Sequence, residues 1–89
     1  MGQPDIPLQM ISVCGADGKL EPLRFRFEDA DHCLHTARVT RLLDSRAVRY
    51  VGVDAFHYIC RAELEGREKL FELRYAVPDH RWVLLRELY

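Results

Sequence analysis

The sequence lacks the paired, closely spaced cysteines of a disulfide scaffold or a zinc site. Cys14, Cys33 and Cys60 are odd in number and far apart, and no CxxC pair occurs. Disulfide-rich domains carry dense, paired cysteines and are secreted, whereas the opening MGQPDIP is polar and broken by proline, unlike a signal peptide. We therefore expect reduced thiols and a cytoplasmic protein.

Long hydrophobic runs and an excess of positive charge are also missing. No apolar stretch approaches the roughly 20 residues of a membrane span, so we expect no membrane partner. Thirteen basic residues face fourteen acidic ones, and the formal net charge is −1. Domains that bind nucleic acid by neutralising its phosphates usually carry a basic excess. Nucleic acid is therefore an alternative partner here, and not the favoured one.

The length allows one domain with a thin core. At 89 residues, folding buries only about 60 to 65% of the surface of the unfolded chain. We expect residues 1–7, which contain two prolines, to form an extended arm, because proline excludes helix there. Residues 8–89 then form a single β domain.

Strict alternation of apolar and polar residues dominates the segment 22–29, PLRFRFED. Successive side chains of a strand point to opposite faces, so this segment predicts a half-buried strand. Its apolar face would carry Leu23, Phe25 and Phe27. Its polar face would carry Arg24, Arg26 and Glu28.

Three later segments, 55–64, 69–77 and 81–88, show the same alternation and predict three further strands. The apolar positions that share a face are Phe56, Tyr58, Cys60, Ala62 and Leu64 in the first, Phe71, Leu73, Tyr75 and Val77 in the second, and Trp82, Leu84 and Leu88 in the third.

Residues 33–43 fit two structures. A helix capped at Asp31 would bring His35, Val39 and Leu42 to one face, whereas a strand would bring together His35, Ala37, Val39 and Arg41. The β-branched residues in the segment favour the strand. Residues 44–54 lack a clean period and contain Gly52, so we expect a connecting loop with room for a helical turn.

These segments predict an all-β fold of about six antiparallel strands. Asp17-Gly18 supplies the positive φ angles of a tight hairpin between the apolar segment 8–14 and residues 22–29. Short turns connect the last three strands, and strands that follow one another in sequence normally pair. A meander with one apolar face must curl to bury it, which predicts a small, partly open barrel or a strongly bent sheet.

The order of these segments resembles a family of small bacterial all-β proteins of unknown function. More distantly, it is similar to the small β domain associated with error-prone DNA polymerase accessory proteins. The matching positions are Gly18, Pro22, Phe25, Phe27, Glu72, Leu73, Trp82 and Leu84. The resemblance implies a small β fold and a link to DNA repair. It assigns no activity, so no catalytic residue is carried over.

The sequence offers weak candidates for catalysis. His57 could pair with Glu63 or Glu72 across neighbouring strands, as general acid-base chemistry requires. Such neighbours are ordinarily cross-strand pairs, and no nucleophile elbow, phosphate loop or metalloprotease motif is present. We therefore predict a protein that is not an enzyme and has no cofactor.

The candidates for metal binding are equally weak. Cys33 and His35 would share a strand face, but His57 and Cys60 are three residues apart and would face opposite sides. Zinc needs four converging ligands. We therefore predict no metal site and place Cys60 in the core, where a free thiol behaves as a small hydrophobic group.

The candidate interaction surface is a row of basic side chains. If the strands over 22–29, 55–64 and 69–77 are neighbours, their outward faces carry Arg24, Arg26, His57, Arg61 and Arg74. Acidic residues, namely Glu28, Glu63 and Glu72, interrupt this row, which favours cross-strand ion pairs over a track for phosphates. Tyr50 and Tyr89 are the tyrosines left for stacking on bases.

Apolar residues on the second face of the late strands suggest a partner subunit. These residues are Ile59, Leu70, Val83 and Leu85. A strand that is apolar on both faces needs a second cover. The leading hypothesis is thus a non-catalytic interaction or accessory module that binds a protein or forms a homodimer. The alternative is a nucleic-acid-associated module linked to DNA repair.

Overall fold

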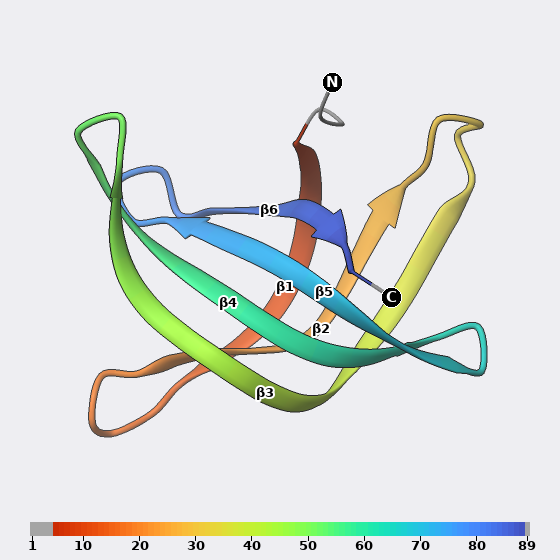
Figure 1. Ribbon diagram of the computed structural model, residues 1–89, viewed down its shortest axis with the longest axis horizontal. Helices are drawn as coiled ribbons and strands as arrows, with labels where there is room; N and C mark the ends of the chain where they lie inside the picture. Colours follow the sequence, from red (N-terminus) through yellow and green to blue (C-terminus); the bar gives the residue numbers. More distant parts are fainter. Residues whose placement is uncertain (1–4, 89) are drawn as a thin grey trace.

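The computed structural model describes residues 5–88, with only the backbone of Tyr50, and these residues form a single β-barrel (Figure 1). The six strands are β1 (Ile6–Cys14), β2 (Leu20–Glu28), β3 (Leu34–Tyr50), β4 (Val53–Leu64), β5 (Arg67–Ala76) and β6 (Arg81–Glu87). Each strand pairs antiparallel with the next, and β1 pairs with β6 to close the barrel. Between residues 5 and 88 there is no helix, and so none that could cross a membrane.

The predicted fold class is confirmed, and the barrel is closed rather than partly open. Residues 34–43 are strand, as their β-branched residues indicate. β1 begins at Ile6, so the last two residues of the expected arm belong to the barrel. Residues 1–4 of that arm lie outside the part of the chain that the structure describes.

The core is an aromatic and aliphatic cluster inside the barrel. Phe25, Phe71 and Leu73 are almost fully buried, and the rings of Phe25 and Phe71 meet edge to face with centroids 5.4 Å apart. Trp82 lies between two tyrosine rings, with centroids 5.1 Å from Tyr58 and 4.9 Å from Tyr75. The alternation over 55–64 and 69–77 therefore points its larger residues inward, as predicted.

The expected loop over 44–54 is wrong, because β3 continues to Tyr50 and β4 starts at Val53. The register of β3 against β4 shifts twice, between Val39 and Arg41 and between Leu42 and Asp44. Each shift inserts one extra residue, which bends the strand and breaks the alternation along the chain. In the sequence, the bulges appear as a loss of the two-residue period. In the structure, they curve β3, a single strand of 17 residues, around the barrel.

A third bulge, between β1 and β2, and the first bulge of β3 each move a side chain away from its predicted face. β1 and β2 are in register up to Ile11 and Arg24 and then again from Ser12 and Pro22, so Leu23 is the extra residue and is exposed. In β3 the extra residue is Thr40, and it moves Arg41 from the face of Ala37 to the outer face, opposite Arg61.

Two of the hairpins are closed by two-residue turns. Val51 and Gly52, between β3 and β4, both have positive φ angles, of 49° and 77°, and Glu65 and Gly66, between β4 and β5, have angles of 51° and 78°. This is the pattern of two-residue turns whose twist matches that of the flanking strands. Val51 is an unusual residue there, because a β-branched side chain strains a left-handed backbone.

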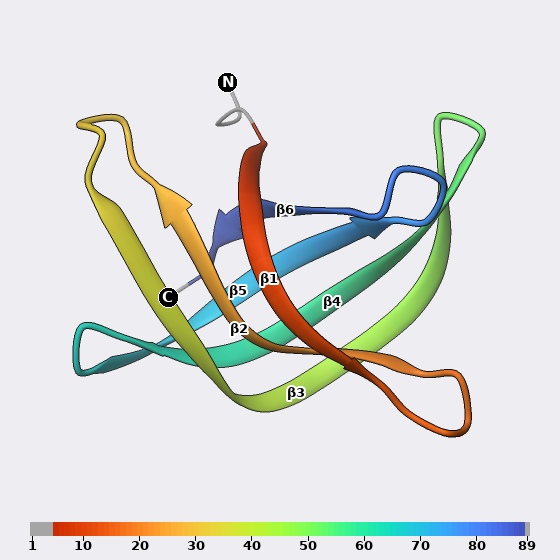
Figure 2. The ribbon, with the colours of Figure 1, turned by 180° about the vertical axis from the view of Figure 1, so that it is seen from behind.

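The hairpin of β1 and β2 extends past the barrel wall, as both ribbon views show (Figures 1 and 2). β1 pairs with β6 only over Ile6–Leu8, and β2 pairs with β3 only from Arg24 onward. The outer part of the hairpin, residues 9–23, therefore has paired strands inside it and few partners on either side. This projecting hairpin positions the candidate site.

Candidate interaction surfaces

One edge of β1 lacks a strand partner. From Gln9 to Cys14 the strand pairs with β2 on one side, and within residues 5–88 no strand pairs with it on the other. A free edge presents a row of backbone N–H and C=O groups that can pair with another chain. The edge is six residues long, close to an average strand.

A groove follows this free edge, and we call it the β1 groove. It has a volume of about 570 Å³ and lies between β1 and the start of β6, where the two strands diverge past the Leu8–Trp82 pair. Trp82 and Tyr75 belong to its apolar lining. His80 also lines the groove, and its Nδ1 lies 2.8 Å from the Tyr75 hydroxyl. The lining residues are Pro7, Leu8, Met10, Ser12, Leu20, Tyr75, His80, Arg81, Trp82 and Val83.

The opposite edge of the hairpin, which β2 forms, has more contacts with the rest of the barrel. A second groove of about 400 Å³ lies between the start of β2 and β3, and it reaches Phe56 and Tyr58 of β4. Across it the hydroxyl of Tyr58 donates a 2.8 Å hydrogen bond to the carbonyl of Leu20. Burial raises the pKa of this tyrosine, so its hydroxyl stays protonated and able to donate. The bond anchors the hairpin to the barrel and satisfies part of the β2 edge.

Large apolar side chains stay exposed on the hairpin. Ile11, at 59% exposure, points outward beside Arg24, and Val13 and Leu23 lie near it. The residues expected to form a second apolar face, Ile59, Leu70, Val83 and Leu85, are instead half-buried within the single chain. A contiguous group of exposed apolar side chains marks a contact surface more often than scattered single side chains do. The hairpin therefore carries the apolar surface that the late strands lack.

The basic row is split by the strand order. β2 lies between β1 and β3, so β3 separates Arg24 and Arg26 from β4 and β5, and the assumed adjacency of these strands is wrong. Arg24 is directly opposite Arg38 of β3, and Arg41 of β3 is directly opposite Arg61 of β4. The side chains of these four arginines and of Arg26 are exposed on the outer face. We call Arg24, Arg26, Arg38, Arg41 and Arg61 the arginine strip.

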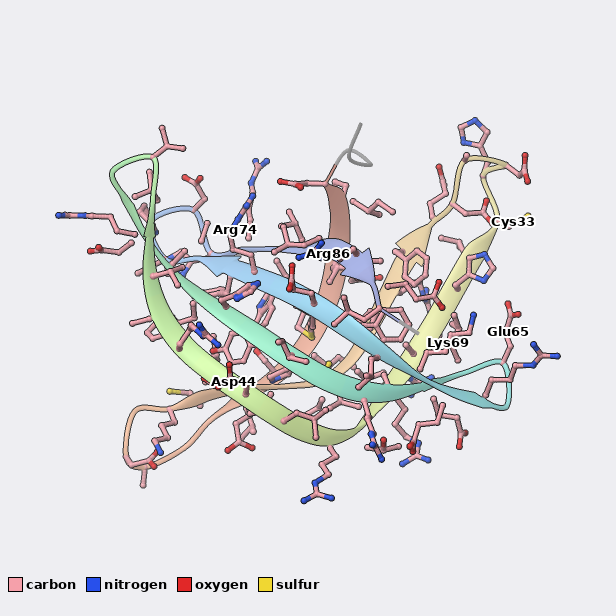
Figure 3. The ribbon with its side chains drawn as sticks, viewed as in Figure 1. Cys33, Asp44, Glu65, Lys69, Arg74 and Arg86 are labelled. Carbon is pink, nitrogen blue, oxygen red and sulfur yellow. The ribbon has the colours of Figure 1, made fainter. Side chains whose placement is uncertain are left out.

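The other two residues of the predicted row lie apart from this strip. His57 and Arg74 are opposite each other on β4 and β5. Arg74 forms a 2.7 Å ion pair with Asp5, and His57 Nε2 lies 3.5 Å from Glu72, which also binds Arg86 at 3.1 Å. Figure 3 shows Arg74 and Arg86 over β5 and β6, away from the β4–β5 turn that carries Glu65. The structure thus brings His57 to Glu72, whereas Glu63 pairs with Arg38 at 3.7 Å.

His35 holds two turns together near the start of β3. Its Nε2 lies 2.7 Å from Asp29 and its Nδ1 2.7 Å from Glu65, while its ring stacks on Phe27 with centroids 5.3 Å apart. In Figure 3, Glu65 extends from the β4–β5 turn toward the β2–β3 hairpin. Because both ring nitrogens face carboxylates, these bonds favour the protonated ring and raise its pKa, mainly through Asp29. The same bond lowers the pKa of Asp29, helped by the amide of Cys33.

The cysteines differ sharply in environment. Cys60 is fully buried, and desolvation raises the pKa of its thiol to about 12. Cys14 and Cys33 are exposed. Among residues 5–88, no three His, Cys, Asp or Glu side chains are arranged to hold a metal ion.

Comparison with protein-family models, curated proteins and solved structures finds no match. The resemblance to the polymerase-associated β domain therefore stays a prediction. Sequence reasoning missed Arg38, Arg41 and the β1 groove. The arginines were visible in the alternation of 33–43, but a bulge decides the face of Arg41. The stacking candidates Tyr50 and Tyr89 have side chains outside the described part of the chain.

Proposed function

We propose that this protein is a non-catalytic interaction module that binds an extended segment of another protein in the β1 groove. The observation that carries the proposal is the free edge of Gln9–Cys14 alongside an apolar groove. In this mode of recognition a peptide adds a strand to a sheet edge: main-chain hydrogen bonds supply affinity, and pockets for alternate side chains supply specificity.

The shape of the groove favours a single strand over a second copy of the chain. Its far wall is formed by the start of β6, with Arg81, Trp82 and Val83 in the lining. We expect one extended segment to pair with the β1 edge beside this wall, whereas a second copy would have to bring the second strand of its hairpin against it. Trp82 and Tyr75 would receive apolar side chains at every second position of the bound segment.

The test is selection of linear peptides from a displayed random library on the whole protein. We expect the selected peptides to share apolar residues at alternating positions. Binding is measured by the fluorescence anisotropy of a labelled copy of a selected peptide.

Two neighbouring exposed positions of β1 supply matched variants. Ser12 lines the groove and Val13 does not, so Ser12→Glu places a charge in the groove and Val13→Glu places the same charge outside it. We expect Ser12→Glu to abolish peptide binding and Val13→Glu to preserve it. Failure to select any peptide, or equal binding by both variants, contradicts the proposal. A light-scattering mass of twice the 10.4 kDa of the chain, returned to the monomer value by Ser12→Glu, identifies a second copy as the occupant instead.

A further inference from the structure

The arginine strip places side chains of the same charge next to one another on neighbouring strands. Arg24 is opposite Arg38, and Arg41 is opposite Arg61, on strands that are direct neighbours. Like charges directly opposite each other on a sheet lower its stability. The chain nevertheless has a net charge of −1, so acidic residues are available elsewhere to separate them.

Acidic side chains neutralise this strip poorly. Arg38 lies 3.7 Å from Glu63, and Arg61 lies 3.7 Å from Glu68. Both distances are beyond hydrogen-bonding distance. Within residues 5–88 no acidic side chain forms an ion pair with Arg24, Arg26 or Arg41. Several pairs elsewhere on the molecule are much closer, at 2.6 Å for Arg46 with Asp44 and 2.7 Å for Lys69 with Glu87. The guanidinium groups of the strip therefore remain available to an external anion.

The middle of the strip lacks the apolar centre of a protein interface, and the exposed Ile11 borders the strip only at Arg24. The polar residues Thr36 and Thr40 lie among the arginines, whereas protein interfaces have an apolar centre and are depleted in charge there. The strand segments around Arg24, Arg26 and Arg38 are paired on both sides, so no strand can add at this place. A ligand that presents repeated negative charge on its own surface suits such a face.

We propose that the arginine strip binds the phosphodiester backbone of a nucleic acid without reading its bases. Arginine presents a planar fork that matches phosphate oxygens in a bidentate way. The aromatic residues of β2, Phe25 and Phe27, belong to the core side of the strand, so bases find no stacking platform next to these arginines. This binding surface is separate from the β1 groove and does not depend on it.

The experiment is fluorescence anisotropy with a labelled oligothymidylate of about 20 nucleotides, a length that covers a typical single-strand site. Four to five phosphate contacts predict a slope of log K against log salt near −3 for a single strand. Reversing two contacts with Arg24→Glu plus Arg41→Glu should reduce affinity at least about tenfold and make the slope shallower by about 1.4.

The matched control reverses two exposed basic side chains outside both the strip and the β1 groove, Lys19→Glu plus Arg49→Glu, with the same change in net charge. We expect this control to bind within about twofold of the parent, because phosphate contacts act locally at a Debye length of about 10 Å. Circular dichroism confirms that both double variants fold. Absence of binding at low salt, or an equal loss in the control, overturns the proposal.

Competition with polyglutamate distinguishes phosphate from carboxylate. If polyglutamate displaces the oligonucleotide at equal charge concentration, the strip recognises acidic protein and the assignment to nucleic acid is wrong. Ser12→Glu, which blocks the β1 groove, should leave the anisotropy unchanged, so failure of the peptide proposal and failure of this one give separate results.

Discussion

The hydroxyl of Tyr58 should anchor the projecting hairpin, and removing it should loosen that hairpin before it loosens the barrel. Tyr58→Phe keeps the ring, which is 2% exposed and packs against Trp82, and deletes only the 2.8 Å bond to the Leu20 carbonyl. An intramolecular hydrogen bond contributes about 1 kcal/mol net, and the carbonyl left without a donor adds a desolvation penalty.

The magnitude follows from the burial of the two partners. Leu20 is half-buried and Tyr58 is buried, and we expect Tyr58→Phe to lower the free energy of unfolding by about 1 to 2 kcal/mol. In a domain of this size each kcal/mol corresponds to about 4 to 8 °C in Tm. Urea denaturation measures the loss, and amide hydrogen exchange should quicken over residues 11–21 while β4 and β5 stay protected.

Tyr75→Phe is the matched control. The Tyr75 hydroxyl contacts only the exposed ring of His80, at 2.8 Å, so its loss should cost less than about 0.5 kcal/mol, as for most surface changes. If the two variants lose the same stability, or if exchange over the hairpin is unchanged in Tyr58→Phe, the hydroxyl does not anchor the hairpin.

Three further predictions concern the turns and the core. Because the pKa of His35 is raised above its usual 6.5, its contribution to stability is complete below that value and is lost as pH rises through the folded pKa; His35→Gln should remove this decline from pH-dependent urea titrations, and a parent protein of constant stability across that window would refute it. A thiol-reactive dye should label Cys14 and Cys33 in the native protein and Cys60 only after denaturation, since the Cys60 thiol is buried with a pKa of about 12; rapid labelling of all three would place Cys60 outside the core. Val51→Asn should raise the free energy of unfolding by about 1 kcal/mol, because asparagine tolerates the positive φ of 49° that strains valine; an unchanged Tm would show that the turn carries no strain.

The strands with a regular period could be predicted from sequence alone. Over 55–64 every second residue from Tyr58 to Leu64 is apolar and is buried in the structure, because a strand places alternate side chains on opposite faces whatever its neighbours. The same rule fails at Leu23 and over 44–50. There a bulge adds one residue, and the cost and benefit of a bulge depend on the partner strand rather than on the local sequence.

The candidate surfaces could be predicted only in part. Arg24, Arg26 and Arg61 were visible as outward residues, but their true neighbours, Arg38 and Arg41, come from a strand that the sequence left ambiguous. His57 and Arg74 belong to another part of the barrel because β3 separates β2 from β4. No local pattern reports which strands are neighbours or where two strands diverge to leave a groove.

The sequence by itself determined that this chain is a β protein with aromatic residues inside and charges outside, since alternation and turn residues act within a few positions of the chain. Only the tertiary structure decided the closure of β1 on β6, the curvature of β3, the free edge beside Trp82 and the clustering of five arginines on one face. Those features arise from register and strand order, which are set by contacts between residues far apart in sequence.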